Sequence, residues 1–420
     1  MQSGGVRLDE LQIIQNMKRE MERNLAECIL PFWREYVPDD VHGGFYGKVN
    51  GNRKPDLTSP KSVVLNCRIL WTFSRAYEKF RDERDKVLAQ RAFDYILRYY
   101  WDDCYQGVYW TVTCKGEPAE LEKRTYGQAF FIYSMAEYYR VFAEPKALEF
   151  AMKTYDLVRK YLKRVDGGYA DSATRDWILD EWVNVWVKNR TGAPKLLNSN
   201  MHLFEALLAL AEVANDPQVM GSLKDQLLFL LDSAADETIG HMKAAMAADG
   251  SRLDGEINYG HDCECAYLIL EAARLFQEAP LLQKAETVVN QMMEQVYKTG
   301  LDPVNGGMYY IADAGTGEVN RSKIWWVQAE GVTAFFDAWQ RTGNDNYLEA
   351  SVSIWNYIKQ DLVNHELGEW YSVGKNRRSD ASLLEEESSL KAVFTNDEMA
   401  GKGKCPYHNS RMCFEMMSRV

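Results

Sequence analysis

A glycine followed by aromatic or apolar residues recurs six times along the chain, and this repeat constrains the fold more than any other feature. Counted from Gly44, the other members are Gly107, Gly168, Gly240, Gly307 and Gly368. The successive steps are 63, 61, 72, 67 and 61 residues. Each step accommodates two helices with their loops, as in other repeat architectures. Each glycine permits a tight turn, and the residues around it are expected to form a short hairpin at one rim.

Between these glycines, apolar residues recur at helical spacing in segments of about 12 to 18 residues. The segments 130–135, 203–210 and 266–272 are apolar on nearly all sides, which is expected of helices covered by an outer layer. The segments 81–99 and 282–297 have one charged face and are expected to be outer helices. An open α-solenoid would show the same repeat, but six units close naturally into a ring. The sequence therefore predicts an all-α (α/α)6 barrel of twelve helices, with residues 1–420 as one catalytic domain.

Composition narrows the classes of function. The net charge of −12 disfavours nucleic acid and anionic membranes as partners. No stretch approaches the roughly 18 apolar residues of a membrane span, and the first residues lack the apolar run of a signal peptide. The eight cysteines include one close pair, Cys263 and Cys265, without a second pair nearby, so no zinc site is predicted. Reduced thiols favour a cytoplasmic protein, which we expect to be a monomer or homodimer.

A second series of polar and aromatic residues alternates with the glycine turns, at the starts of apolar helices. Its six members are Asn66/Arg68, Tyr126/Gln128, Asn198/His202, His261/Glu264, Trp326/Glu330 and His408/Arg411. If the inner helices run in the same direction, their N-terminal ends meet at one mouth and these side chains converge on one pocket. Helix N-termini add partial positive charge there, which would favour an anionic intermediate. The remaining histidines, His42, His241 and His365, fall near glycine turns and are interpreted as surface or loop residues.

Two pairs in this series have helical spacing. His261 and Glu264 are three residues apart, so Glu264 is expected to hydrogen-bond the imidazole and fix its tautomer. His-x-x-Glu is also a possible metal-ligand spacing, although the sequence assigns no third ligand, and acid–base use is favoured. Trp326 and Glu330 lie four residues apart on one helical face. A ring for stacking beside a carboxylate for hydroxyl groups suits a sugar, whereas Trp325 points elsewhere and is expected in the core.

Four stretches together resemble the cellobiose 2-epimerase branch of the N-acylglucosamine 2-epimerase family. They are Asn66-Cys67-Arg68-Ile69-Leu70-Trp71, Tyr259-Gly260-His261-Asp262-x-Glu264, residues 325–330, and Lys404-Cys405-Pro406-Tyr407-His408-Asn409-x-Arg411-Met412. The resemblance spans nearly the whole chain in order. It implies an (α/α)6 barrel, no cofactor, no metal, and a sugar as the small-molecule substrate.

The resemblance also implies the chemistry, which is epimerisation at carbon 2 of the reducing-end residue of a β-1,4-linked disaccharide such as cellobiose or mannobiose. His261 and His408 would be the acid/base histidines, and His202 would assist ring opening. The sugar would be bound by Arg68, Tyr126, Asn198, Glu264, Trp326 and Glu330. After ring opening, one imidazole can remove the C2 proton, and the other can return it to the opposite face of a cis-enediolate.

The chain departs from the family pattern at two places. The family has tryptophan immediately before the Lys-Cys-Pro-Tyr-His motif, where this chain has Gly403. Loss of that stacking platform puts the disaccharide preference in question, with a monosaccharide such as mannose or glucose as the alternative. Asn200 also stands where close relatives often carry another histidine. The polar segment 374–403 is interpreted as a mobile lid.

Three other functions remain open. An aldose–ketose isomerase of the same superfamily would share the enediolate but deliver the proton to C1. A glycoside hydrolase on this barrel would need two carboxylates flanking a glycosidic bond, whereas the predicted mouth is richer in histidine. A binding protein without activity would not need both His261 and His408.

Overall fold

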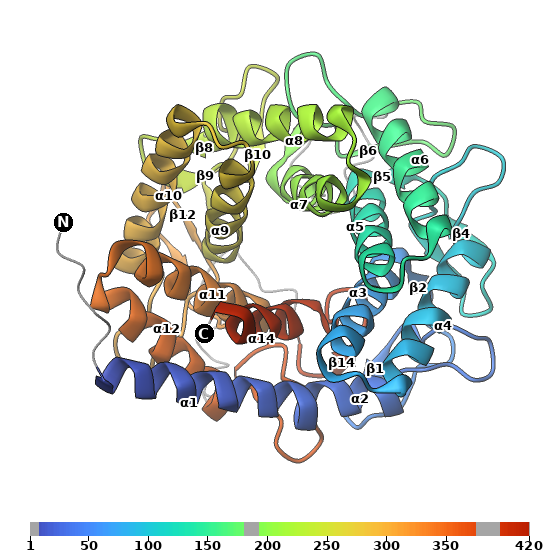
Figure 1. The fold of residues 1–420 in the computed structure, drawn as a ribbon, viewed down its shortest axis with the longest axis horizontal. Coiled ribbons are helices and arrows are strands. Elements are labelled where there is room, and N and C mark those ends of the chain that lie inside the picture. The colour runs from blue at the N-terminus through green and yellow to red at the C-terminus, as the bar shows by residue number, and fades with distance from the viewer. Residues whose placement is uncertain (1–7, 180–192, 375–394, 420) are drawn as a thin grey trace.

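The computed structural model describes residues 8–179, 193–374 and 395–419. Its helices form two concentric rings around a central axis (Figure 1). The inner ring consists of α3 (Val63–Phe80), α5 (Thr125–Phe142), α7 (Leu197–Ala214), α9 (Tyr259–Leu275), α11 (Trp325–Thr342) and α14 (Tyr407–Arg419). The predicted (α/α)6 barrel is confirmed, because an outer helix alternates with each inner one along the chain.

The outer ring begins with a long N-terminal helix made of α1 (Leu8–Asn24), the π-helical turn η1 (Leu25–Ile29) and α2 (Leu30–Glu35). It continues with α4 (Glu83–Tyr99), α6 (Pro145–Tyr161), α8 (Pro217–Phe229), α10 (Ala279–Thr299) and α12 (Asp345–Tyr357), and the π-turns η2 (Leu230–Ala234) and η3 (Ile358–Leu362) extend α8 and α12. The ring closes where α14 packs against α11, α3 and α1. The described helices include none with the length and apolar character needed to cross a membrane.

Local sequence explains where the helices start and stop. The side chains of Asp82, Asp216 and Asn344 accept hydrogen bonds from the first turns of α4, α8 and α12. Such caps satisfy backbone N–H groups that have no partner inside the helix. Inner helices such as α5 and α7 are buried along most of their length and end at residues with left-handed backbone, Ala143 and Asn215.

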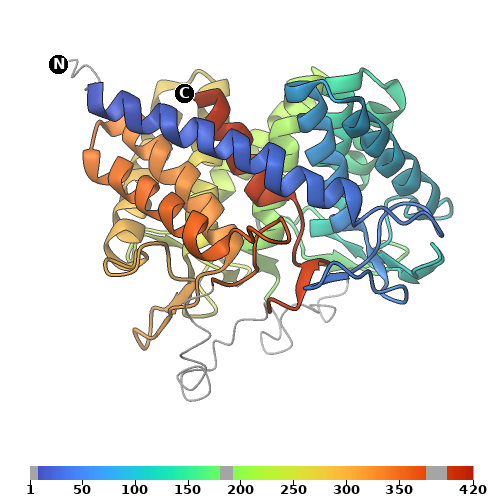
Figure 2. The ribbon, with the colours of Figure 1, turned by 90° about the horizontal axis from the view of Figure 1, so that it is seen from below.

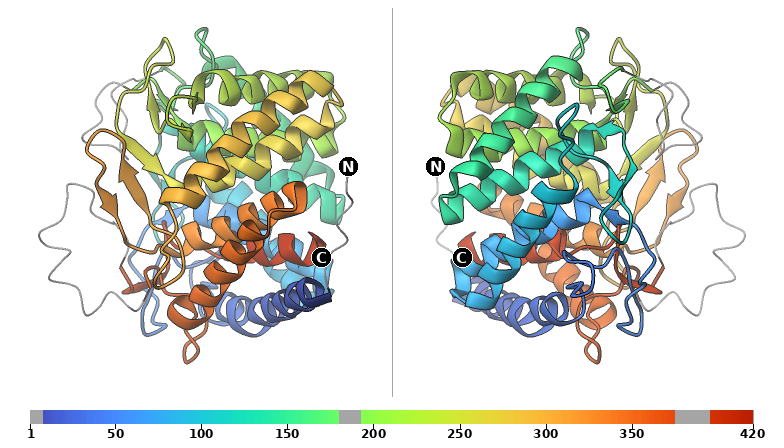
Figure 3. Two further views of the ribbon diagram at one scale, coloured as in Figure 1. Left: turned by 90° about the vertical axis from the view of Figure 1, so that its left-hand side faces the viewer. Right: turned by 90° about the vertical axis from the view of Figure 1, so that its right-hand side faces the viewer.

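Short antiparallel strands gather at one end of the barrel, the lower end in Figure 2, and Figure 3 shows them from the two flanks. The strands are β1 (Val49–Asn50), β2 (Lys61–Ser62), β3 (Thr111–Val112), β4 (Pro118–Glu120), β5 (Lys123–Arg124), β6 (Ser172–Ala173), β7 (Lys195–Leu196), β8 (Ala235–Asp236), β9 (His241–Met242), β10 (Ala245–Met246), β11 (Glu256–Asn258), β12 (Ile311–Asp313), β13 (Val319–Asn320) and β14 (Glu398–Ala400). The pairs β2–β3, β5–β6, β7–β10, β11–β12 and β14–β1 each join one repeat to the next. The strands therefore form a rim that connects the repeats.

The six glycine turns lie in this rim, each following an outer helix. All six glycines have positive φ: Gly44 at +62°, Gly107 at +69°, Gly168 at +70°, Gly240 at +70°, Gly307 at +75° and Gly368 at +74°. A Cβ at residue 168 would lie 2.8 Å from the Phe229 ring, so both conformation and space require glycine there. The hairpins predicted from the glycine series are confirmed by the backbone pairing around each turn.

Candidate active site

The inner helices start at the strand rim, and their first two turns point polar side chains toward the barrel axis. The second residue of a helix supplies Tyr126, Asn198, Trp326 and His408, and the sixth supplies Arg68, His202, Glu264 and Glu330. Positions four residues apart share a helical face, so one face of each helix serves the site. His261 is the third residue of α9 and Arg411 the fifth of α14. For these residues of the second series, the predicted convergence at one mouth is therefore present in the structure.

His408 forms a buried pair with Glu330. The Nδ1 atom of His408 lies 2.5 Å from Glu330 Oε1, and both side chains are at most 6% exposed. Burial raises the pKa of Glu330, but Arg411 and His408 outweigh it and bring that pKa to about 2. An ionised carboxylate only accepts hydrogen bonds, so Nδ1 carries the proton and the basic lone pair is on Nε2. Burial lowers the pKa of His408 to about 3, which keeps the ring neutral.

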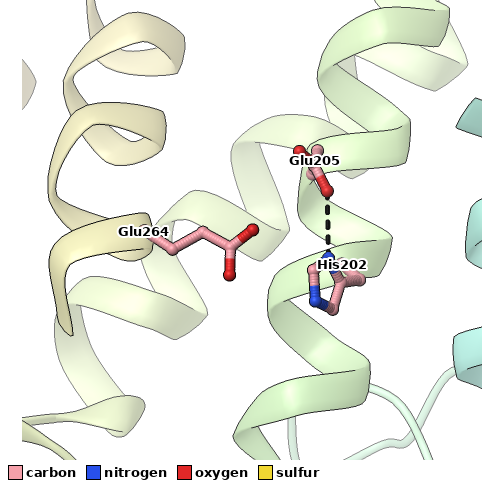
Figure 4. A group of neighbouring side chains, drawn as sticks. All are labelled: His202, Glu205 and Glu264. Atoms are coloured by element: carbon pink, nitrogen blue, oxygen red, sulfur yellow. Dashed lines mark hydrogen bonds and ion pairs between the residues drawn. The ribbon is translucent and has the colours of Figure 1, made fainter. Parts of the chain in front are cut away.

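His202 forms a second pair of this kind with Glu205, three residues along α7. The distance from His202 Nδ1 to Glu205 Oε2 is 2.9 Å, and Figure 4 shows the pair beside Glu264 of α9. The imidazole packs against Tyr126 and Phe130, with ring centroids 5.0 and 4.8 Å away. Burial lowers the pKa of His202 to about 3. Two neutral imidazoles thus stand at the site, each held at Nδ1 by a glutamate.

His261 is partly buried, and its ring lies beside that of Trp326. The centroids of the two rings are 5.2 Å apart, and Trp326 also lies 5.5 Å from the His408 ring. The indole therefore contacts both histidines. The first turn of α9 is fixed because Asn258 Oδ1 accepts a hydrogen bond of 3.2 Å from the backbone N–H of His261.

Arg68 is a buried cation within a cage of aromatic rings. Its guanidinium carbon lies 4.2 Å from the Phe130 centroid and 5.1 Å from that of Tyr407. One terminal nitrogen donates to Tyr126 Oη at 2.8 Å and the other contacts Cys405 Sγ at 3.1 Å. Among the described residues, no carboxylate lies within ion-pair distance of this guanidinium. An unneutralised buried cation is suited to stabilise an anion.

Arg411 connects the glutamates below the histidines. It donates to Glu205 and Glu264, and its Nη2 lies 2.7 Å from Glu330 Oε1. The guanidinium and the three carboxylates are at most 5% exposed. One cation therefore holds side chains from α7, α9 and α11, which fixes the three helices relative to one another at the floor of the site.

Two groups of side chains have the donors and spacing of a metal site. They are His202, Glu205 and Glu264, and Glu264, Glu330 and His408, with the ligand atoms of each group within 4.8 Å of one another. Arg411 already supplies positive charge to all three carboxylates. A divalent ion would have to displace that guanidinium, so the donor set does not fit a resident metal.

Two expectations from the sequence are wrong. Glu264 makes no hydrogen bond to His261, because its Oε1 binds Arg411, a charged partner that gives a stronger bond than a neutral imidazole. His241 is not a surface residue. It is 5% exposed in β9, and its Nδ1 lies 2.7 Å from Asp262 Oδ2. The glycine turn that contains His241 packs against the first turn of α9, and this contact buries the imidazole ring.

Gln128 of the second series holds the rim and is not in the site. Its side chain exchanges two hydrogen bonds with the backbone of Val108, at 3.0 and 2.8 Å, next to the glycine turn. Asn200 and Gln328 likewise exchange hydrogen bonds with the backbone of the residues after Gly168 and Gly307. The side-chain amide of Asn200 both donates and accepts in this contact, which explains asparagine at this position. All three are the fourth residue of an inner helix.

Sequence reasoning missed three features. Glu205 was hidden in an apolar helix, although its three-residue spacing from His202 is the spacing that drew attention to Glu264. Tyr407, which donates to Glu205, lies beside His408 and was quoted only within a motif. Five lysines precede inner helices by two or three residues and pair with acids near the glycine turns: Lys61 with Asp39, Lys123 with Asp102, Lys195 with Asp166, Lys323 with Asp302 and Lys404 with Glu369. The recurrence of lysine at the same place in five repeats could have indicated these ion pairs from the sequence.

The fold and the arrangement of histidines, glutamates and aromatic rings define a barrel of the kind found in carbohydrate-active enzymes. The solved structure of cellobiose 2-epimerase from Bacillus thermoamylovorans matches 97% of this chain and 100% of its own, with TM-score 0.87 and 28% identity. That from Spirochaeta thermophila matches 98% of both chains, with TM-score 0.87 and 30% identity.

Sequence comparison gives the family. The model of the N-acylglucosamine 2-epimerase family matches residues 44–390. The cellobiose 2-epimerase of Bacteroides fragilis is 31% identical over 403 residues, which cover 96% of this chain and 98% of that protein. The chain belongs to the N-acylglucosamine 2-epimerase family and is an isomerase that acts on carbohydrate.

Proposed function

We propose that this isomerase interconverts the glucose and mannose configurations at carbon 2 of the reducing-end residue of a β-1,4-linked disaccharide such as cellobiose or mannobiose. The observation that carries the proposal is the contact of one indole, Trp326, with both His261 and His408. Removal of the C2 proton from the open-chain sugar and its return to the opposite face of the planar enediolate require two acid/base groups close together. The names of the relatives described above support the same substrate class.

The proposed steps use the residues as follows. His202, with its proton fixed at Nδ1 by Glu205, takes part in opening the ring to the aldehyde. One of His261 and His408 takes the C2 proton, and Arg68 stabilises the enediolate that forms. Rotation about the C2–C3 bond exposes the other face, and the second histidine, which must be an imidazolium at this point, returns a proton to C2 while the first histidine keeps the proton that it took. The second carbon is inverted and no redox change occurs.

The other members of the site have binding roles in this proposal. Trp326 offers a ring to the sugar, Tyr126 lines the pocket beside Arg68, and Asn198 lies partly buried at the start of α7. Glu330 was expected to bind sugar, but its contacts support a positioning role for His408. Residues 1–420 act as one catalytic unit in this proposal, since the site draws on all six inner helices.

The alternative substrate is a monosaccharide, and the observation that favours it is the exposed turn at Gly403. Trp110 lies nearby and does not replace the missing platform, because Arg124 and Lys402 lie over its ring at 4.4 and 5.1 Å. Residues 375–394, most of the predicted lid, lie outside the described residues.

The test is incubation in D2O with cellobiose, mannobiose, glucose and mannose separately, followed by NMR. A 2-epimer with deuterium at C2 from a disaccharide is the expected product. A ketose as the main product would assign the chain to the aldose–ketose isomerases, and cleaved sugar would indicate a hydrolase. Turnover of the monosaccharides alone would replace the disaccharide proposal with its alternative.

The two-base mechanism has its own test. With His261→Asn and His408→Asn, epimerisation is expected to be lost, while each variant still exchanges the C2 proton of one epimer with solvent. The two variants should act on opposite epimers. Loss of exchange with both epimers in either variant would contradict two independent bases.

A further inference from the structure

The three glutamates bound to Arg411 differ in the number of hydrogen-bond donors that reach them. Glu330 accepts from Tyr267 at 2.7 Å, from Arg411 and from His408. Glu205 likewise accepts from Tyr407, Arg411 and His202. Glu264 accepts from Arg411 alone, and among the described residues its Oε2 has no hydrogen-bond partner although the residue is fully buried. Two of the carboxylates are therefore satisfied as anions and the third is not.

The charges of the buried side chains at the site agree with this difference in hydrogen bonding. Arg68 and Arg411 bring two buried positive charges, and the neighbouring histidines are neutral because burial lowers the pKa of His202 and His408. With Glu205 and Glu330 ionised, the charges balance. An ionised Glu264 would leave a net negative charge among side chains that are almost fully buried, which is costly.

Glu264 faces charged and titratable groups on every neighbouring inner helix. They are Tyr126 of α5, His202 and Glu205 of α7, Glu330 of α11, and Tyr407, His408 and Arg411 of α14, with Tyr267 on its own helix α9. Arg411 alone binds it directly, and it shares this cation with two other carboxylates.

We propose that Glu264 is a neutral carboxylic acid in the resting enzyme, whose O–H donates a hydrogen bond to a sugar oxygen. This inference rests on the proposed function. An ionised glutamate could only accept a hydrogen bond from a sugar hydroxyl, whereas the neutral acid donates one to a sugar oxygen. Burial, followed by the charge of Glu330, raises the pKa of Glu264 to about 7, which agrees with the geometry. The carboxyl group of Glu264 points toward His202 and Glu205 in Figure 4, on the side of the site where ring opening is proposed.

The proposal predicts a pH profile. If the active form has Glu264 protonated, kcat declines as pH rises through about 7, since the donor is lost and negative charge enters the site. In Glu264→Gln the amide keeps a donor and no charge at this position. We expect this variant to retain kcat within about tenfold and to lose the alkaline decline.

Glu330→Gln is the matched control, because it makes the same isosteric change on the same guanidinium at a glutamate that must be anionic. Here kcat is expected to fall at least about 100-fold, because His408 loses the acceptor that fixes its tautomer. Equal loss in the two variants, or an unchanged alkaline limb in Glu264→Gln, would overturn the proposal.

A spectroscopic measurement tests the protonation state of Glu264 without depending on the proposed reaction. The infrared carbonyl-stretch band of a buried protonated carboxyl should be present in the wild-type protein below about pH 7 and absent from Glu264→Gln. This band needs no substrate and no turnover, so it can be observed even if none of the four sugars reacts. A difference spectrum without the band would show that Glu264 is ionised, whatever the enzyme's substrate.

Discussion

The barrel contains two sets of buried charged groups, and they are built differently. Near the rim, lysines such as Lys61 and Lys123 each bind an acid of their own repeat, with both partners at most 1% exposed. At the axis, one cation, Arg411, is shared by glutamates from three helices. Within the described parts of the chain, the second cation, Arg68, contacts a thiol, a phenol and aromatic rings but no carboxylate. The balanced pairs at the rim hold the fold, whereas the shared charges at the axis leave groups that can bind a ligand. The comparison predicts that the two sets can be separated by mutation.

The largest combined effect is expected for Arg411→Met, because it removes the cation from three buried carboxylates. The free energy of unfolding should fall by about 3 to 5 kcal/mol. The value of kcat should fall about 100- to 1,000-fold, since both histidine–glutamate pairs lose their support. Urea unfolding and the NMR assay measure the two effects, and a loss of stability alone would mean that the axis set is structural like the rim set.

His408→Asn should affect activity without a matching loss of stability. We expect kcat to fall about 100- to 10,000-fold, the usual contribution of a general acid or base. The control is His241→Asn, because His241 is also a buried histidine bound to an acid but lies in the rim. Its kcat should stay unchanged, and equal losses in both variants would remove the distinction between axis and rim.

Lys61→Met should lower the stability of the protein without changing its activity. Lys61 donates to Asp39 at 2.7 Å and to the carbonyl oxygen of Gly43 at 2.8 Å, and its loss leaves a buried carboxylate unpaired. The free energy of unfolding should fall by about 3 to 5 kcal/mol with kcat unchanged. Lys153→Met, which breaks an exposed pair with Glu149, should change stability by no more than about 0.5 kcal/mol.

The last prediction concerns the stability of the protein in acid. Burial lowers the pKa of His202 and His408 to about 3, below the value of about 6.5 in an unfolded chain. Between these values the unfolded chain binds more protons, so stability should decline as pH falls from about 6.5 toward 3, and should be flat above 6.5 for these groups. Each contributes up to about 1.4 kcal/mol per pH unit. Urea unfolding across this range should give a shallower slope for His408→Asn, and parallel profiles would mean that this histidine is not held neutral.

Local patterns were sufficient to predict the fold and to identify most of the polar side chains that the inner helices bring together. The glycine turns and apolar helices are each encoded within a few residues, and Trp326 and Glu330 share a face by helix geometry alone. The partners of the site residues are not local. Arg411 binds Glu264 across 147 positions and Glu205 across 206. Which acid a buried arginine selects depends on helix packing, so the sequence pointed Glu264 to the wrong partner and left Glu205 unnoticed.

The closing position of α14 has a consequence for synthesis. Because α14 follows the other inner helices in chain order, Glu205, Glu264 and Glu330 emerge from the ribosome well before Arg411. Until then, these carboxylates have neither their guanidinium nor the helix that fills the gap between α11 and α3. A nascent chain therefore cannot complete the ring or assemble a competent pocket early. Activity arises in a single late event, when translation delivers both the last inner helix and the charge that its neighbours require.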